Sequence, residues 1–311
     1  MVIYIISDGK KGHLSQTRGL AQALLRRAAE QGTGQHSCYE VDVSHMSLLA
    51  KLFYRGKELS YPPADIILCA GHGTHIPALR LAHRMHCPCM VCMKPSLPMR
   101  MFSLVIAPQH DFPADATLPS CVFLTNGSLN AISPHPEVEK KETLLLIGGP
   151  SKEFDWDEDH LLTQLSTITR YNTRPMVLTT SRRTPAVFTT QLTTASPGIR
   201  IEPVETTGPN WVAEHLASAS EVWVTQDSVS MVYEALSSGA PVGIIEMPSN
   251  HKRAGKAGSR VTRGLTRLVE GGYVTTFTQW AKTHTLISGP PLNEAERAAD
   301  HILTLYPNLL S

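Results

Sequence analysis

The chain has 311 residues, 42% of them hydrophobic, so it can bury substantial cores, and its length favours two domains of ordinary size over one. A formal net charge of +1 argues against a wholesale nucleic-acid binder. No apolar run approaches the roughly eighteen residues of a membrane-spanning helix, and polar residues follow the N-terminus too soon for a signal peptide, so we expect a cytoplasmic protein.

Apolar runs alternate with helical patterns along most of the chain, which is typical of parallel sheets connected by crossover helices. In the first half the pattern predicts strands over residues 2–7, 39–43, 66–70, 90–93, 104–107 and 122–124. Helices are predicted over residues 15–31, 47–51 and 77–85.

A segment rich in proline and charge, residues 133–142, interrupts this pattern and marks a domain boundary. The pattern then resumes, with strands over 143–147, 176–179, 199–201, 221–224 and 242–246 and helices over 158–168, 210–217 and 228–237. We therefore predict an α/β fold of two doubly wound, Rossmann-like domains, residues 1–137 and 138–292, facing a central cleft. Residues 293–311 are predicted to hold a helix that crosses back to the first domain.

The turn after the first strand contains Asp8, Gly12 and His13. Glycines permit close approach of the backbone to a ligand, and a histidine near a strand end can act as a general base. We select His13 and Asp8 as candidate catalytic residues and Gly12 as an acceptor contact, with ordinary loop chemistry as the plainer alternative. Gly9 and Gly12 do not give the three-glycine spacing of the dinucleotide-binding fingerprint.

The loop after the third strand contains Gly71, His72, Thr74 and His75. Threonine and the glycine amides can bind an acceptor oxygen or a phosphate, so we predict acceptor contacts at these four residues. The two histidines also raise the question of a metal, but no carboxylate lies nearby in the sequence, and hydrogen bonding is the favoured role.

Cys87, Cys89 and Cys92 form a short cluster that also raises the question of zinc. The cluster lies in a predicted buried strand, whose alternating geometry sends Cys89 and Cys92 to opposite faces. We therefore predict reduced, buried thiols and no metal site.

In the second domain, Gly149 and the pair Ser181–Arg182 each follow a predicted strand, and we predict donor contacts at all three residues. Ser181 and Arg182 are predicted to reach a diphosphate, because a guanidinium supplies paired donors to phosphate. An exposed, capped helix start is the alternative for this pair.

The most informative segment surrounds the helix predicted over residues 228–237. Asp227 is expected to be its N-cap, and Ser228 and Ser230 fall in the first turn, where free N–H groups and the helix dipole favour an anion. Asp227, Ser230 and Glu234 share one helix face, which we predict binds the phosphate and sugar of a donor. The alternative is a capped helix with two incidental serines and a solvated glutamate.

Six basic residues lie between Lys252 and Arg267, and Arg260, Arg263 and Arg267 share one face if the stretch is helical. A solvated face is the default interpretation. The functional one is a peripheral contact with phosphates or an anionic membrane surface, such as the inner membrane.

Five ordered motifs resemble a known family over nearly the whole chain: SDGKKGHLSQTRGLAQAL at residues 7–24, CAGHGTH at 69–75, APQHD at 107–111, TTSRRT at 179–184 and TQDSVSMVYEA at 225–235. The chain is similar to the mitochondrial-fission family of plants and proteobacteria, whose bacterial members are described as glycosyltransferases or nucleoside-diphosphate-sugar epimerases. The resemblance implies a GT-B architecture, like that of the enzyme that adds N-acetylglucosamine to lipid-linked peptidoglycan precursors.

The resemblance also implies roles for single residues. Glu234 is expected to accept hydrogen bonds from the donor ribose, Ser181, Arg182, Ser228 and Ser230 to bind the diphosphate, and His13 to lie near the reacting sugar carbon. The first loop lacks the run of consecutive glycines of the peptidoglycan enzyme, so the acceptor is not carried over.

The sequence therefore predicts a metal-independent glycosyltransferase with a nucleotide-diphosphate sugar as its substrate, no cofactor, and an unknown acceptor for which a lipid-linked or cell-envelope molecule is one candidate. Two alternatives remain. The first is a nucleoside-diphosphate-sugar epimerase. The second is a non-catalytic nucleotide-binding or scaffold protein related to mitochondrial fission factors.

Overall fold

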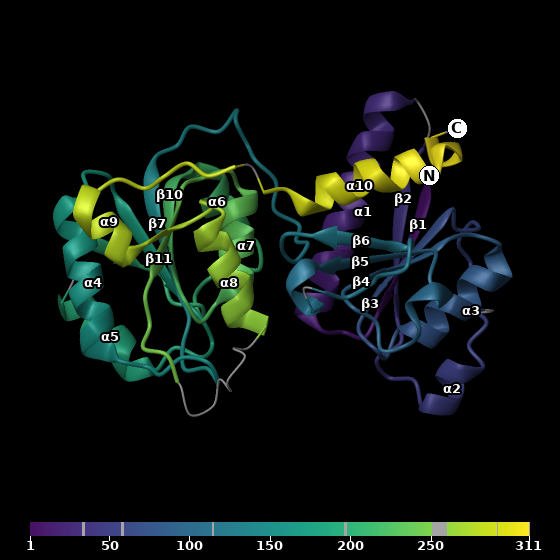
Figure 1. Cartoon of the computed structure of the whole chain (residues 1–311), viewed down its shortest axis with the longest axis horizontal. Coiled ribbons are helices and arrows are strands. Elements are labelled where there is room, and N and C mark those ends of the chain that lie inside the picture. Colours follow the sequence, from purple (N-terminus) through teal and green to yellow (C-terminus); the bar gives the residue numbers. More distant parts are fainter. Residues whose placement is uncertain are drawn as a thin grey trace. The chain divides into compact units, whose positions relative to one another are not determined.

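The computed structural model describes residues 1–32, 35–56, 59–113, 115–195, 198–250, 260–290 and 292–310. The chain divides into two compact units (Figure 1). Unit 1 comprises Met1–Ala131 and Asn293–Ser311, and unit 2 comprises Ile132–Leu292. None of the helices in the described ranges is long and apolar enough to cross a membrane.

Unit 1 is built on a six-stranded, fully parallel sheet with the order β2-β1-β3-β4-β5-β6. Its strands are β1 (Val2–Ser7), β2 (Ser37–Asp42), β3 (Ile66–Ala70), β4 (Cys89–Cys92), β5 (Leu104–Pro108) and β6 (Val122–Thr125). Its helices are α1 (Lys11–Gln31), α2 (Leu48–Leu52), α3 (His75–Met85) and α10 (Glu294–Leu305), with 3₁₀ turns at Met99–Met101, Gln109–Asp111 and Pro307–Leu310.

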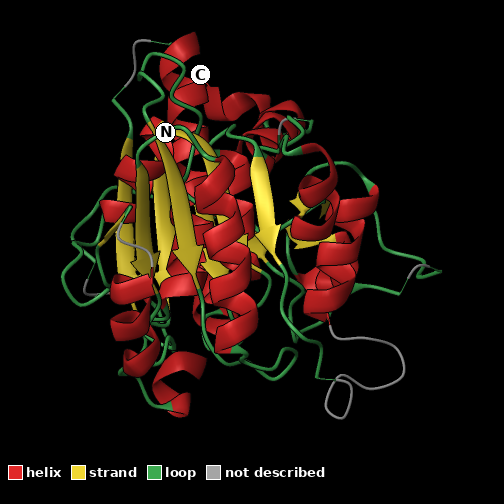
Figure 2. Ribbon diagram, turned by 90° about the vertical axis from the view of Figure 1, so that its left-hand side faces the viewer, coloured by secondary structure: helices red, strands yellow, loops and turns green. Residues whose placement is uncertain are grey.

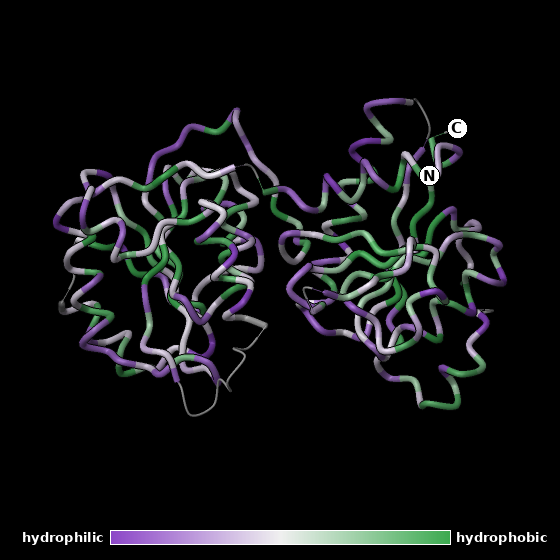
Figure 3. Tube along the Cα trace, viewed as in Figure 1, coloured by the Kyte–Doolittle hydropathy of each residue, from purple (hydrophilic) through white to green (hydrophobic). Residues whose placement is uncertain are grey.

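Helices cover both faces of this sheet (Figure 2). On one face, Ile3 and Ile5 pack with Leu24 of α1 and Ile302 of α10. On the other face, Ile6 packs with residues of α3. Because both faces are covered, the central strands carry continuous apolar runs, the pattern expected of a parallel sheet. Green, hydrophobic segments run through the inside of this unit in Figure 3, where the strands lie.

Unit 2 holds a second parallel sheet, with the order β12-β11-β10-β7-β8-β9. Its strands are β7 (Glu142–Ile147), β8 (Met176–Thr180), β9 (Ile199–Ile201), β10 (Ala219–Thr225), β11 (Val242–Ile245) and β12 (Thr275–Thr276). Its helices are α4 (Glu158–Tyr171), α5 (Ala186–Ala195), α6 (Trp211–Ser218), α7 (Val229–Ser237), α8 (Arg260–Glu270) and α9 (Phe277–Thr283). The fully buried Trp223 and Val224 point to opposite faces of β10 and join separate cores.

The two strand orders determine where each sheet has its topological switch point, at which successive connections leave in opposite directions. In unit 1 this point lies between β1 and β3, and in unit 2 between β7 and β10. Ligands of doubly wound sheets bind outside the carboxyl ends of the strands at such points. The turns that follow these four strands are therefore the first place to look for a site in each unit.

The predicted α/β class with doubly wound sheets is confirmed, and most elements lie within a few residues of their predicted bounds. One difference affects the site. α1 begins at Lys11 rather than at residue 15, so Gly12 and His13 lie in the first helical turn and not in a loop. The sequence also gave no prediction for α5, α9 and β12.

Candidate functional site

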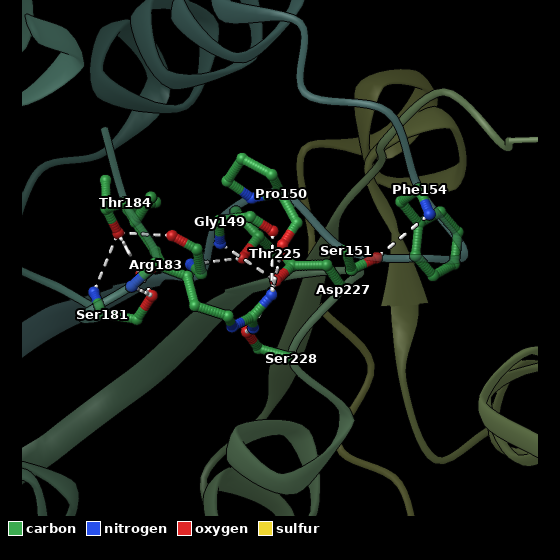
Figure 4. A network of polar contacts seen from close by, with 12 residues as sticks. Gly149, Pro150, Ser151, Phe154, Ser181, Arg183, Thr184, Thr225, Asp227 and Ser228 are labelled. Atoms are coloured by element: carbon green, nitrogen blue, oxygen red, sulfur yellow. Dashed lines mark hydrogen bonds and ion pairs between the residues drawn. The ribbon is translucent and has the colours of Figure 1, made fainter.

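The switch point of unit 2 holds a connected polar network (Figure 4). Asp227, which follows β10, accepts a hydrogen bond from the backbone N–H of Gly149 at 3.0 Å and forms an ion pair with Arg183 at 2.7 Å. Gly149 follows β7 and Arg183 follows β8, so the network ties together the ends of three strands. The Asp227 carboxylate is fully buried, whereas the Arg183 side chain is 45% exposed.

Arg183 acts as the clamp of this network. Nη1 donates to the carbonyl oxygens of Gly149 and Pro150, and Nη2 donates to Asp227 and to the Ser228 hydroxyl. These bonds use four of the five N–H groups of a guanidinium. Arg183 is therefore largely committed to holding the turns in place.

Arg182, the arginine selected from the sequence, lies next to this clamp. It is exposed and forms no hydrogen bond or ion pair within the part of the chain that the structure describes. Its neighbour Ser181 is half-buried, and the Ser181 hydroxyl accepts from the backbone N–H of Arg183 at 3.1 Å, which shapes the turn. Sequence reasoning missed Arg183, because two adjacent arginines in a turn give no signal that separates the inward one from the outward one.

The prediction that Asp227 is the N-cap of α7 is wrong. Ser228 occupies the N-cap position, and neither side chain caps the helix. The reason is the buried position of Asp227, where Oδ2 already accepts from Arg183 and from the Gly149 N–H. Its Oδ1 atom is buried and has no hydrogen-bond partner among the described residues. The first N–H groups of α7 therefore have no side-chain cap. An anion site at a helix start requires such uncapped N–H groups.

Two glycines of the turn after β7 allow this close packing. A Cβ atom on Gly148 would stand 2.2 Å from both Asp227 Oδ2 and Ser228 Oγ. A Cβ atom on Gly149 would stand 2.3 Å from the Arg183 carbonyl oxygen. Neither position has room for a side chain, so both glycines are required by the site.

Glu234 and Ser230 follow on α7. Ser230 is exposed, and Glu234 is half-buried without a hydrogen-bond partner for its carboxyl group among the described residues. Burial raises the pKa of Glu234 from 4.5 to about 7. A carboxyl group that is partly desolvated and unpaired is frequent at functional sites, because a structural role usually supplies a partner.

A cavity of about 300 Å³ opens nearby, lined by Gln226 at the end of β10, by Ile244 and Glu246 at the end of β11, and by Thr262 and Leu265 of α8. Its volume lies at the lower end of the range for small-molecule pockets. Gln226 immediately precedes Asp227, so the cavity adjoins the polar network within unit 2.

The switch point of unit 1 holds a second constellation, in which Asp8 and His13 form a pair. His13 Nδ1 lies 2.9 Å and 3.0 Å from the two Asp8 oxygens. Burial acts most strongly on Asp8 and would raise its pKa, but the hydrogen bond and charge of His13 and the contacts with Lys10 together lower it below 3.8. A carboxylate on Nδ1 holds a histidine in the tautomer whose Nε2 accepts a proton.

Gly71, at the end of β3, packs directly against this pair. It has a positive φ of +87°, and a Cβ atom there would stand 2.3 Å from the His13 ring and 3.0 Å from Asp8 Oδ2. The first turn and the glycine–histidine loop, which the sequence placed at separate strand ends, therefore meet in one unit. Gly12 lies on the exposed side of α1, where a Cβ atom would meet nothing within 4 Å.

The other residues predicted at this loop differ in accessibility. Thr74 is fully buried, and its hydroxyl donates to the carbonyl oxygens of Ala70 and Gly71. His75 is 2% exposed, with its Nδ1 3.3 Å from Ser96 Oγ, and its pKa falls to about 4 chiefly through burial and also through the charges of His72 and His13. His72 is the exposed histidine of the loop.

Residues 251–259 of the basic region lie outside the described residues. Arg263 and Arg267 lie on helix α8, and Arg263 is exposed. Cys89 and Cys92 are buried in β4, and the structure forms no cluster of three or more metal-ligating side chains in the ranges it describes.

Comparisons with known proteins place these features in context. The model of the family described as mitochondrial fission ELM1 matches residues 11–306. An uncharacterised protein of Rickettsia prowazekii (strain Madrid E) is 26% identical, with 97% of this chain and 98% of that protein covered.

Solved structures of similar fold share little sequence. A UDP-N-acetylglucosamine 2-epimerase from Listeria monocytogenes is 12% identical with a TM-score of 0.60, covering 99% of this chain and 97% of that one. The UDP-GlcNAc 2-epimerase of Methanocaldococcus jannaschii is 12% identical, with a TM-score of 0.54 and coverage of 98% and 100%. The glycotransferase of kitacinnamycin is 14% identical, with a TM-score of 0.51 and coverage of 97% and 98%. These likenesses show the fold, and because the family model matches nearly the whole chain, the protein belongs to the mitochondrial fission ELM1 family.

Proposed function

We propose that this protein is an enzyme of nucleotide-diphosphate sugars and that it transfers the sugar to an acceptor hydroxyl. The observation that carries the proposal is the carboxyl edge of unit 2, where the uncapped start of α7, the outward Arg182 and the half-buried Glu234 lie around one clamped turn. Proteins of similar fold are named as UDP-N-acetylglucosamine 2-epimerases and as a glycotransferase, which supports the same substrate class.

In this proposal the diphosphate binds to the N–H groups at the start of α7, with Ser230 and Arg182 as further donors, whereas the Ser228 hydroxyl donates to Asp227. The Glu234 carboxylate accepts hydrogen bonds from the ribose hydroxyls. The adjoining cavity of about 300 Å³ receives the nucleobase. Arg183 and Asp227 do not touch the donor and instead hold the turns in position.

We assign acceptor binding and the catalytic base to unit 1. His13 Nε2 takes the proton of the acceptor hydroxyl, and the oxygen forms a bond to the anomeric carbon. The bond between that carbon and the diphosphate oxygen breaks, and its electron pair leaves with the diphosphate, whose charge the α7 amides and Arg182 stabilise. Asp8 fixes the His13 ring, and His72 and Gly71 border the space beside it.

Isothermal titration with UDP and GDP tests the donor site. We expect binding by the unaltered protein and a loss of roughly tenfold or more in Arg182→Ala and in Glu234→Ala. Arg170→Ala, an exposed arginine at the end of α4, is the matched control and should bind normally. Absence of binding of either nucleotide, or equal binding by all variants, would contradict a donor site at α7.

The epimerase alternative shares the fold and the nucleotide but needs no acceptor. Incubation with UDP-N-acetylglucosamine alone, followed by product analysis, separates the two reactions. If a new stereoisomer of the sugar nucleotide forms, the reaction is epimerisation and not transfer. A non-catalytic role would be favoured if the protein binds the nucleotide but catalyses neither transfer nor epimerisation. In that case His13→Ala should leave the cellular phenotype unchanged.

A further inference from the structure

An apolar patch and a basic pocket lie side by side in unit 1, and neither contains a residue assigned above. The apolar patch consists of Leu48, Leu49, Leu52 and Phe53, residues that are 87%, 70%, 43% and 66% exposed. All four lie on or directly after the short helix α2, whose segment is green at the lower edge of unit 1 in Figure 3. So many exposed large apolar residues on one short element usually mark an interaction surface.

The patch belongs to an ordered element. Ser47 caps α2 by accepting a hydrogen bond from the backbone N–H of Ala50 at 3.2 Å, and α2 packs on α3. The residues Leu48, Leu49, Leu52 and Phe53 follow the spacing of one helix face. The large apolar residues of this helix therefore lie on its outer face, where the described part of the chain leaves them exposed.

The basic pocket begins where the patch ends. It is a cavity of about 740 Å³ whose lining includes Arg55, Arg80, Arg84, His83 and His86. Arg80 donates through Nε to the Tyr54 carbonyl oxygen at 3.3 Å, and Arg84 donates to the carbonyl oxygen of Arg55. These two arginines of α3 hold the chain just after α2, so the pocket and the patch are adjoining parts of one surface.

We propose that unit 1 docks on an anionic membrane surface, with the apolar patch inserted among the lipid chains and the basic pocket holding lipid phosphate groups. A lipid surface is the partner that offers apolar chains and a layer of phosphate together at short range, which matches both halves of this surface. A soluble anion would account for the pocket but not for the exposed leucines. This docking surface differs from the basic region between Lys252 and Arg267.

The helix that carries the patch also lies close to the acceptor loop through Lys51. A side chain at Gly73 would stand 3.5 Å from the Lys51 ammonium of α2 and 3.8 Å from Cβ of Asp8. The inner side of α2 thus borders the Asp8–His13 pair while its outer side carries the patch. If the proposed function holds, on which this step rests, the membrane presents a lipid-linked acceptor to His13.

Flotation of the full chain with vesicles tests the docking without any nucleotide or activity, so its outcome is independent of the proposed function. The vesicles contain phosphatidylethanolamine with about 30% phosphatidylglycerol, and matched vesicles of phosphatidylcholine serve as the neutral comparison. We expect binding to the anionic vesicles, weakened when NaCl rises from about 0.1 M to about 0.5 M.

Two double variants test the apolar patch and the basic pocket separately. We expect Leu49→Ser/Phe53→Ser and Arg55→Glu/His83→Glu each to reduce vesicle partitioning by about tenfold or more. These residues are exposed, so the folds should persist, which circular dichroism and the melting temperature verify. Val187→Ser/Leu305→Ser removes exposed apolar residues elsewhere, and Arg170→Glu reverses a charge elsewhere, and both should bind like the unaltered chain.

Three results would overturn the proposal. The first is no binding to anionic vesicles, and the second is equal binding to neutral ones. The third is retained binding in both double variants, with loss instead on changing Lys252 and Arg253 to glutamate, which would assign membrane contact to the other basic region.

Discussion

Arg183 Nη2 donates to Asp227 Oδ2 over 2.7 Å, which bridges the turns after β8 and β10 across the end of the strand that separates them, β7. The turn after β7 is enclosed by this bridge, because Gly149 donates to Asp227 and accepts from Arg183. One ion pair therefore holds the three turns around which the proposed donor site is built.

Replacing Arg183 with alanine should destabilise unit 2, because the fully buried Asp227 carboxylate loses its charged partner. Arg183 is itself 45% exposed, so solvent replaces part of the lost interaction. We expect the calorimetric melting temperature to fall by roughly 2–8 °C, the consequence of about 1–3 kcal/mol.

Arg182→Ala is the matched control, since the neighbouring arginine is exposed and unpaired among the described residues. Its melting temperature should change by no more than about 1 °C, while its nucleotide affinity falls. Equal destabilisation by the two substitutions would contradict the division into a clamp and a ligand-facing arginine.

This pair also shows how far the sequence predicts the site. The alternation of apolar runs with helical patterns gave the fold class, and the turns after β1, β3, β7 and β10 follow from it. The distinction between Arg182 and Arg183 depends on the course of a four-residue turn, which no periodicity encodes. The same holds for Asp227, whose sequence context is that of an N-cap, while its tertiary partners determine its position.

The start of α1 shows a second limit. The glycines at positions 9 and 12, just before His13, favour a loop by propensity, yet the helix begins at Lys11. A glycine costs a helix about 1 kcal/mol, which packing elsewhere in the helix overcomes. α5, α9 and β12 escaped prediction because short elements with weak periodicity carry little signal.

Two glycines of unit 1 are expected to respond differently to substitution by alanine, one through close packing and the other through helix propensity. Gly71→Ala should push the His13 ring from Asp8, because the new methyl group would stand 2.3 Å from that ring at a position with φ of +87°. Gly12→Ala should leave the pair intact and stabilise α1 by roughly 0.5–1 kcal/mol, since nothing lies within 4 Å of its Cβ position.

The measurement is the thermal stability together with a crystal structure or histidine NMR spectrum of each variant. We expect Gly71→Ala to destabilise by about 2 kcal/mol or more and to change the His13 resonances. An unperturbed His13 in Gly71→Ala would mean that the loop moves away at little cost, and that Gly71 does not position the histidine.

The raised pKa of Glu234 predicts how stability depends on pH. Because burial raises this pKa from 4.5 to about 7, the folded protein favours the uncharged acid. The contribution of Glu234 to stability is therefore fully present below pH 4.5 and is lost as the pH rises through about 7. One pKa unit corresponds to about 1.4 kcal/mol, so with allowance for partial exposure Glu234→Gln should stabilise the protein at pH 8 by roughly 1–3 kcal/mol.

Urea unfolding at pH 4 and pH 8 tests this expectation, with Glu205→Gln, at an exposed position of unit 2, as the control. The increase in the free energy of unfolding caused by Glu234→Gln should appear at pH 8 and vanish at pH 4. Nucleotide affinity should move in the opposite sense, rising between pH 6 and pH 8, since a ribose diol binds the ionised carboxylate. A gain of stability that is the same at both pH values would assign it to packing and not to the charge.

Asp8→Asn tests whether the pair in unit 1 acts as an oriented base. The asparagine preserves the size of the side chain but removes the charge, and its amide can present N–H to His13 Nδ1 and so favour the wrong tautomer. With the nucleotide sugar identified by titration, we expect kcat to fall by about 100-fold to 10,000-fold. The dissociation constant of the nucleotide should stay unchanged, because Asp8 belongs to unit 1 and the nucleotide is assigned to unit 2.

The control is Asp42→Asn, which changes an exposed carboxylate at the end of the neighbouring strand β2 and should retain activity. If Asp8→Asn instead weakens nucleotide binding and leaves kcat intact, the Asp8–His13 pair holds phosphate, and the base must be sought elsewhere.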